Sequence, residues 1–400
     1  MTDVLIVGGG LAGLSTAKSI LANSNYKVCL IEKKKNSDNN ALRLTFTDVI
    51  KNYDLMDCIR AEYNSFGIMS CYGARSMHRF DDNRFVALDY KKSCDKFLND
   101  LLSNSNFNCI SDRATELDIN EKYVRVSLKD NSPIDAKIFV DASGSGHFSL
   151  VQRDLGLPKL YSHSFGQSFE DCANGNVNEA WFFGASADYG SGGGWYYPLD
   201  EDKASVGFAV ITQSSKFPSV RVREKYFKAI KEINPINQYL KSAKPVKLEA
   251  GTIPIDHISG FSGQRLLVTG DAAGQATPWM CMGIEPILYN SDMVADVAIS
   301  ALDANDFSAS YLSKYDAEWN KKRLVQFNSV KNMNPQIWFA GDAVWDFIIE
   351  KDIALLTPQQ FYERVRYNRH LMSGWTSFFR WSLFRLKHVR DWNKYKKIMP

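Results

Sequence analysis

Three glycines near the start of the chain are spaced in a way that suits the binding of a pyrophosphate. The sequence reads Gly8-Gly9-Gly10-Leu11-Ala12-Gly13, so that Gly8, Gly10 and Gly13 form the pattern G-x-G-x-x-G. In this pattern the first glycine makes a tight turn, the second lets the backbone approach the phosphates, and the third lets a helix pack on a strand. The free N–H groups at the start of that helix, together with its dipole, then hold the anion.

A carboxylate follows at the position that a dinucleotide needs. Residues 4–7 and 28–31 are continuous apolar runs, which predict two buried parallel strands, and Glu32 comes directly after the second one. A carboxylate at the end of this strand accepts hydrogen bonds from both ribose hydroxyls of an adenosine. This favours FAD or NAD over NADP at the site. A βαβ unit that binds no nucleotide is the alternative.

A second loop of the same kind lies more than two hundred positions further on. There an apolar run ends in Thr269 and is followed by Gly270-Asp271 and by small residues. NAD does not need such a distant loop, whereas a long ligand such as FAD needs a remote carboxylate for its ribityl chain and backbone amides for its ring. We therefore predict FAD as the cofactor.

In chain order, the three glycines, Glu32, Asp141-Ala142-Ser143-Gly144 and Gly270-Asp271 resemble the glutathione-reductase-type flavoproteins of the p-hydroxybenzoate-hydroxylase class. Pro278 and Gly283-Ile284 extend the resemblance, which covers roughly residues 1–305. Ser143 replaces the acid of the hydroxylases, and the loop is closer to the form of the geranylgeranyl reductases and lycopene cyclases. Arg43 is either a cofactor-binding arginine, as in this class, or a surface residue. The resemblance implies the cofactor-binding residues Gly8, Gly10, Leu11, Ala12, Gly13, Glu32, Lys33, Arg43, Gly144, Gly270, Asp271, Pro278, Gly283 and Ile284.

The fold that this resemblance implies is α/β. A glutathione-reductase-type Rossmann FAD domain is interleaved with an antiparallel β-sheet substrate domain, and a helical C-terminal region follows. The apolar spacing from Ile284 onwards predicts a helix whose amino terminus would point at the flavin. We expect the FAD domain at 1–65, 90–155 and 255–305, the substrate domain at 66–89 and 156–254, and the helical region with a basic aromatic tail at 306–400.

An aromatic stretch in the predicted substrate domain resembles a motif of the geranylgeranyl reductases. Trp195, Pro198 and Gly207 match this motif, whereas Gly193 replaces its first tyrosine, which we expect to widen the cavity. Trp195 and Tyr197 alternate along one strand and therefore share a face. They are either core aromatics of the sheet or line the substrate cavity. The predicted substrate-binding residues are Trp195, Tyr197, Pro198 and Trp279.

Glu285 is the acid next to the predicted flavin loop, and two interpretations of it stay open. It suits the first turn of a helix, where the dipole favours a carboxylate, and it also suits a proton donor close to the flavin. We name Glu285, Trp195 and Tyr197 as candidate catalytic residues. The cysteines and histidines show no metal-ligand spacing, so no metal is expected.

These features predict an FAD-dependent oxidoreductase that reduces C=C bonds of an isoprenoid or another long apolar substrate by hydride transfer from reduced flavin. An external electron donor, such as NAD(P)H or ferredoxin, is required. The alternatives are a flavin-dependent monooxygenase or halogenase, and a carotenoid-type cyclase that uses reduced flavin. No halogenase-specific lysine can be placed in the sequence. A prenyl-binding escort protein ranks last, because the flavin motifs are intact.

Charge and composition bear on the location of the protein and on its partners. The net charge of +3 is too small to predict nucleic-acid binding. Seven cysteines without a C-x-x-C pair, and no signal peptide or membrane span, indicate a cytoplasmic protein. Residues 372–400 hold seven Lys or Arg and one acid among several aromatics. This tail either contacts a membrane surface peripherally or packs on the body of the protein.

Overall fold

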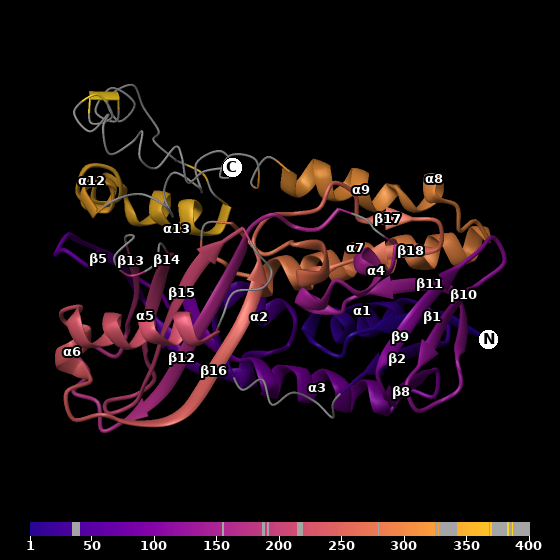
Figure 1. The fold of residues 1–400 in the computed structure, drawn as a ribbon, viewed down its shortest axis with the longest axis horizontal. Coiled ribbons are helices and arrows are strands. Elements are labelled where there is room, and N and C mark those ends of the chain that lie inside the picture. The colour runs from indigo at the N-terminus through magenta and orange to yellow at the C-terminus, as the bar shows by residue number, and fades with distance from the viewer. Residues whose placement is uncertain are drawn as a thin grey trace.

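The protein was analysed as a computed structural model, which describes residues 1–33, 41–153, 156–185, 189, 192–213, 219–278, 280–324, 327, 342–367, 369, 382, 383 and 386. The described chain forms two lobes that lie side by side along the long axis of the molecule (Figure 1). One lobe contains both chain segments that resemble nucleotide-binding loops. The other lobe is built around an antiparallel sheet. Most of the predicted tail at 372–400, and Trp279, lie outside the described residues.

The first lobe is a mixed sheet with its long helices on one face. Its strands follow the order β17-β18-β11-β1-β2-β8, and β10 and β9 continue from β11 on a side branch. The strands β18, β11, β1, β2 and β8 are parallel, which brings their carboxyl ends to one edge. The strands are β1 (Thr2–Val7), β2 (Val28–Glu32), β8 (Phe107–Ser111), β9 (Ala114–Ile119), β10 (Val124–Leu128), β11 (Ile134–Asp141), β17 (Ser262–Gly263) and β18 (Leu266–Val268).

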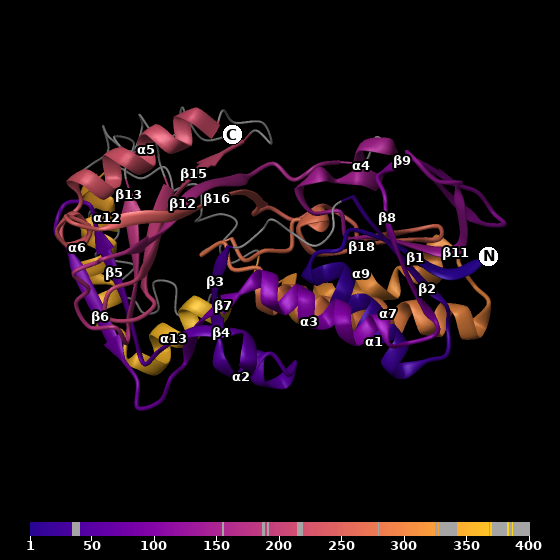
Figure 2. The ribbon, with the colours of Figure 1, turned by 90° about the horizontal axis from the view of Figure 1, so that it is seen from below.

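Helices α1, α3 and α7 cover one face of this sheet, and α4 lies with β9 on the other (Figure 2). The inner strands read as nearly uninterrupted apolar residues because both of their faces are buried. The helices of this lobe are α1 (Leu11–Asn23), α3 (Tyr90–Leu102), α4 (Phe148–Gln152), α7 (Ile284–Ala304), α8 (Ala309–Leu312) and α9 (Lys314–Trp319).

The second lobe is a sheet in the order β16-β12-β15-β14-β13-β5-β6. All neighbouring strands are antiparallel except β13 and β5, which are parallel. These two strands come from distant parts of the chain. The strands are β5 (Ser65–Ser70), β6 (Arg75–Arg79), β12 (Tyr161–Glu170), β13 (Glu179–Ala185), β14 (Gly192–Pro198), β15 (Ala204–Thr212) and β16 (Lys244–Pro254).

Different helices cover the two faces of the second sheet. Helix α5 (Ser219–Glu232) packs on β12 and β15, with α6 (Ile236–Tyr239) beside it. Helices α12 (Asp342–Lys351) and α13 (Pro358–Tyr367) lie against β5, β6 and β13 on the opposite side (Figure 2). Trp345 of α12 lies so close to Gly184 that a Cβ on this glycine would be 2.3 Å from the indole ring. The C-terminal helices thus complete the second lobe.

A small sheet, β3-β7-β4, connects the lobes. It consists of β3 (Leu42–Phe46), β7 (Phe85–Asp89) and β4 (Ile59–Tyr63), and α2 (Thr47–Asn52) follows β3. The architecture is therefore α/β, with a nucleotide-type lobe, an antiparallel sheet lobe and a helical C-terminal region, as predicted. The domain boundaries remain a prediction, and β7 pairs with β3 and β4 rather than with the substrate sheet.

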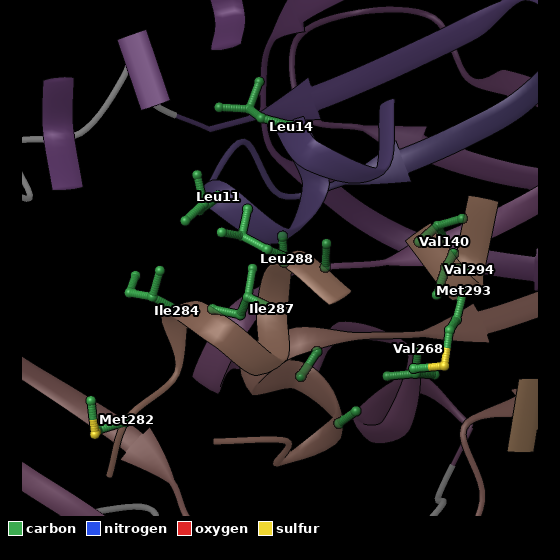
Figure 3. Packing of buried hydrophobic residues seen from close by; sticks show 14 of the residues in the cluster. Leu11, Leu14, Val140, Val268, Met282, Ile284, Ile287, Leu288, Met293 and Val294 are labelled. Carbon is green, nitrogen blue, oxygen red and sulfur yellow. The ribbon is translucent and has the colours of Figure 1, made fainter. Parts of the chain in front are cut away.

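The core of the first lobe lies between α1 and α7. Leu11 of α1 lies near Ile284, Ile287 and Leu288 of α7 (Figure 3). Polar contacts cross the same interface, where the hydroxyls of Ser15 and Ser291 are 2.6 Å apart and the Ser291 hydroxyl donates to the carbonyl oxygen of Ala12 at 3.2 Å. Within the described chain, no helix is both long enough and apolar enough to cross a bilayer.

Replacing Leu288 by alanine tests this packing. Leu288 is fully buried, so we expect Leu288→Ala to lower the free energy of unfolding by about 2–5 kcal/mol through lost burial and a cavity. The midpoint of urea unfolding, followed by circular dichroism, measures the change. Leu102→Ala is the matched control, because Leu102 is 59% exposed and its loss should have little effect. Equal losses for the two variants would contradict the described interface.

Candidate active site

Gly8, the first residue of the glycine loop, and Glu32 line a cavity of about 190 Å³ at the carboxyl ends of β1 and β2. Such an edge of a parallel sheet is where nucleotides bind in open α/β folds. Arg113, which follows β8, lies in the same wall, and the sequence analysis did not single it out. The described lining residues are Val7, Gly8, Ile31, Glu32, Lys33, Asp112, Arg113, Ala114, Ser143, Gly146 and Phe148.

The glycines of this loop are required by close approaches of the backbone. Gly8 has a φ of +116°, and a Cβ there would be 2.1 Å from the carbonyl oxygen of Ala142. A Cβ on Gly13 would be 1.9 Å from the carbonyl oxygen of Gly8. Glu32 accepts a hydrogen bond from the N–H of Gly9 at 2.6 Å, which fixes its carboxylate beside the loop. The geometry agrees with the physical roles inferred for Gly8 and Gly13.

The segment Asp141–Gly146 is a second wall of this site, and its aspartate has a structural role. The fully buried Asp141 accepts hydrogen bonds from the N–H groups of Ser143 and Ser149, at 2.9 and 2.7 Å, and from the Ser149 hydroxyl. His147 contacts the carbonyl oxygen of Ala272 through Nδ1 at 2.9 Å. Burial lowers the pKa of His147, so its imidazole is neutral near pH 7. These contacts join the Ser143 loop to the Gly270-Asp271 loop.

A larger cavity of about 380 Å³ lies between these loops and the face of the second sheet. Ser143 lines both this cavity and the first one, so the two are neighbours. Glu32 lies in the wall of the first cavity and Asp271 in the wall of the second. Tyr90, another residue that the sequence analysis missed, lines the larger cavity, and its hydroxyl accepts a hydrogen bond from the N–H of Leu11 at 3.0 Å.

Asp271 and Arg43 supply the charges of the larger cavity. Burial raises the pKa of Asp271 to about 6, and the guanidinium of Arg43 partly opposes this shift. Among the described residues, no side-chain donor within hydrogen-bond distance meets the Asp271 carboxylate. Arg43 is 4.0 Å from Glu249, whose pKa burial also raises. A carboxylate in the cavity wall without a protein donor suits the hydroxyls of a ligand such as a ribityl chain.

Some residues of the predicted flavin loop line the larger cavity, and others do not. Gly283 and Ile284 line the larger cavity together with Cys281, whose φ is +54°. Burial raises the pKa of the Cys281 thiol to about 12, so the thiol is neutral. Gly270 has a φ of +65° and packs against Ala12. Pro278 does not line either cavity.

The aromatic strand forms the apolar wall of the larger cavity. The rings of Trp195 and Tyr197 stack with centroids 6.3 Å apart, and both line the cavity. The Trp195 indole lies over Gly207, where a Cβ would be 1.9 Å from the ring. This explains the spacing of the motif, because the glycine on β15 makes room for the tryptophan on β14. Pro198 lies outside the cavity wall and accepts a hydrogen bond from the Tyr63 hydroxyl through its carbonyl oxygen.

The structure corrects the expectation for Gly193. We predicted that the missing aromatic widens the cavity, but the ring of Phe182 on β13 occupies that place. A Cβ on Gly193 would be 2.4 Å from Phe182, and Phe182 itself lines the cavity. The aromatic side chain is therefore supplied by the neighbouring strand. Only the register of β13 against β14 reveals this exchange.

The structure also corrects the second interpretation of Glu285. Its carboxylate is buried outside the cavity wall and pairs with Nε of Arg366 from α13 at 3.0 Å. Arg366 also binds Asp48 of α2 at 2.8 Å. Burial raises the pKa of Glu285, whereas Arg366 favours its charged form. Glu285 thus anchors the C-terminal helix to the start of α7, and the structure does not place it as a proton donor to the cavity.

Similarity to known proteins agrees with this geometry. A family model described as lycopene cyclase protein matches residues 3–178. A digeranylgeranylglycerophospholipid reductase of Methanopyrus kandleri is 27% identical over 147 residues, 36% of this chain and 36% of that relative, so the match spans about a third of the relative's length. A protein of the same name from Methanosphaera stadtmanae is 25% identical over 86% of this chain and 85% of the relative.

Two solved structures share the fold. A geranylgeranyl bacteriochlorophyll reductase-like protein of Thermoplasma acidophilum has a TM-score of 0.78 at 16% identity and covers 92% of this chain and 97% of that chain. A flavin-dependent brominase has a TM-score of 0.73 at 13% identity and covers 97% of this chain and 99% of that chain. At such identities the likeness concerns the fold alone.

Because the pKa of Asp271 is raised, replacing this residue should stabilise the protein by an amount that depends on pH. When a carboxyl has a higher pKa in the folded protein than in the unfolded chain, the free energy of unfolding falls as the pH rises between these two pKa values. Without added nucleotide, Asp271→Asn should therefore be more stable than the natural chain by about 1–2 kcal/mol at pH 7, and by less at pH 5. Urea unfolding at the two pH values measures the difference. A variant that is destabilised by the same amount at both values would contradict the buried, donor-free carboxylate.

Proposed function

We propose that the chain is an FAD-dependent oxidoreductase that reduces C=C bonds of a long apolar isoprenoid substrate, since it is similar to the lycopene cyclase family model and to proteins named digeranylgeranylglycerophospholipid reductase. The observation that carries the proposal is the wall of the larger cavity. Trp195, Tyr197 and Phe182 contribute aromatic rings to the wall of the cavity that Asp271 also lines. Burial of a flexible apolar chain against such a surface gives a favourable free energy of binding and needs no polar contacts.

The residues of the two cavities fit the parts of FAD. Glu32 suits the adenosine ribose, the backbone at Gly8 suits the pyrophosphate, and Asp271 suits the ribityl hydroxyls. The loop before α7 would lie along the ring, with the positive end of the helix dipole behind it. When bound and reduced, FAD supplies a hydride.

The protein contributes orientation, exclusion of water and a proton. Trp195 and Tyr197 would hold the double bond flat against the opposite wall, since they form one stacked surface. Burial raises the pKa of Tyr197, so its Oη keeps its proton at neutral pH, whereas the positive charge of Arg43 opposes this rise and would favour a transient phenolate. We assign the proton-holding role to Tyr197 rather than to Glu285. The electrons come from an external donor, for which NAD(P)H or a ferredoxin is suitable.

A flavin-dependent monooxygenase or halogenase is the second candidate, because the brominase shares the fold. The described lining residues of the larger cavity include one cationic side chain, Arg43, and no lysine. A halogenase-specific lysine therefore has no counterpart among them. A carotenoid-type cyclase, which uses reduced flavin without net redox change, is the third candidate, in view of the match to the lycopene cyclase family.

The products of an anaerobic reaction separate these candidates. The purified protein, loaded with FAD and reduced with dithionite, is incubated with geranylgeranyl lipids, and mass spectrometry identifies the products. We expect the addition of two hydrogens for each double bond reduced. Tyr197→Phe should lower the turnover number by about tenfold or more while substrate binding persists, because it removes only the proton. An unchanged mass with a new ring would favour the cyclase, and a product formed only with oxygen would favour the monooxygenase or halogenase.

The adenosine end of the site gives an independent test of the cofactor. Glu32→Gln keeps the shape of the side chain but loses the charge that accepts hydrogen bonds from the ribose. We expect about a tenfold weaker affinity for FAD, measured by flavin fluorescence titration of the stripped protein. Glu116→Gln is the matched control, because Glu116 is exposed on β9 and lies outside both cavities. Absence of flavin binding in the natural chain would overturn the proposal.

A further inference from the structure

The outer face of the substrate lobe has a basic and apolar surface that the cavity does not use. Eight Lys or Arg and two Glu occur between residues 219 and 248, whereas the whole chain of 400 residues has a net charge of only +3. This segment includes α5 and the first half of β16. Helix α5 lies on the side of the sheet away from α12 and α13, as Figures 1 and 2 show.

Large apolar side chains are exposed on the same face. Phe227 of α5 lies with its ring 6.1 Å from Phe165 of β12. In the register of β12 and β16, Phe165 is opposite Ala250 and Gln167 is opposite Leu248. Residues 165 and 167 point to one face of their strand, so Leu248 lies on the α5 side of the sheet. The apolar side chains that are between 41 and 61% exposed there are Val220, Phe227, Val246 and Leu248.

Cationic side chains surround these apolar ones. Arg221, Arg223 and Lys231 lie on the exposed side of α5 and form no salt bridge with any residue that the structure describes. The Arg223 guanidinium lies 5.5 Å from the centre of the Phe227 ring. Lys244, at the start of β16, pairs with Asp171 at 2.8 Å, and both are solvent-exposed. Positive charge is therefore interleaved with exposed apolar groups over one surface.

We propose that this α5–β16 surface, formed by the exposed side chains of α5 together with Val246 and Leu248, docks on an anionic lipid bilayer. Basic side chains attract anionic headgroups, while aromatic and aliphatic side chains enter the boundary between headgroups and acyl chains. A nucleic acid would use the cations but leave the apolar side chains without a role. A second copy of the chain would bring like charges together, which costs free energy.

This surface is distinct from the tail at 372–400, for which the sequence analysis predicted membrane contact. It is also independent of the reaction, because none of its exposed side chains lines the larger cavity. A failure of membrane binding would therefore leave the proposed reductase activity untouched, and a protein without that activity could still bind vesicles.

Vesicle co-sedimentation of the full chain tests the proposal. Vesicles of phosphatidylglycerol and phosphatidylcholine in equal amounts should bind the natural chain, and pure phosphatidylcholine should bind it much less. Arg221→Glu, Arg223→Glu and Lys231→Glu in one variant should weaken binding to the anionic vesicles by at least about tenfold. Phe227→Ser with Leu248→Ser should weaken binding as well, and this loss should persist at low salt, because it is not electrostatic.

The control variant carries Lys122→Glu and Lys129→Glu on the β9–β10 side of the other lobe, and should bind like the natural chain. Flavin content and circular dichroism verify that each variant is folded. Three results would overturn the proposal: no binding of the natural chain to anionic vesicles, equal binding of the triple charge variant, or equal binding of the natural chain to both vesicle types. Tight binding to duplex DNA without vesicle binding, or self-association abolished by the apolar substitutions, would assign the surface to a different partner.

Discussion

The close approach of three backbone segments is the constraint on which the rest of the structure depends. The Gly8 turn lies against the carbonyl of Ala142, the first turn of α1 lies over Gly8, and Gly270 packs on Ala12. These contacts leave no room for side chains, so the glycines set how near the loops can come. The hydrogen bonds of Asp141, and the contact of His147 with Ala272, then hold the loops in place. Because the three loops meet, the two cavities are neighbours that share Ser143 in their walls.

The second lobe supplies the aromatic wall of the larger cavity. In this wall a large side chain on one strand occupies the space over a glycine on the neighbouring strand. Trp195 lies flat because Gly207 on the neighbouring strand has no side chain, and Phe182 fills the space over Gly193. Large and small residues thus alternate across β13, β14 and β15. This arrangement produces a smooth aromatic face, which suits a substrate without polar groups. It also shows that a motif can lose one aromatic position while the surface keeps an aromatic ring there.

The C-terminal helices connect the lobes through buried charge. Arg366 on α13 joins Glu285 at the start of α7 to Asp48 on α2. Arg364 on the same helix pairs with Asp352 at 2.5 Å and is almost completely buried. Removing one partner of a buried ion pair destabilises a protein more than removing one partner of a surface pair, because the remaining buried charge is no longer hydrated. The loop that lines the larger cavity just before α7 therefore depends on a helix some eighty residues further along the chain.

The sequence by itself determined the glycine-containing turns and the strand-end carboxylate. Gly8, Gly13, Glu32 and the helix from Ile284 follow from local spacing, since turns, caps and helical periodicity are properties of neighbouring residues. The α/β class and the sharing of one strand face by Trp195 and Tyr197 could be predicted for the same reason. Only the tertiary structure decided the roles of side chains whose partners are remote. Glu285 binds Arg366 rather than the cavity, Tyr90 meets the start of α1, and Phe182 replaces the missing aromatic of the motif. These contacts depend on register and helix docking, which local spacing does not specify.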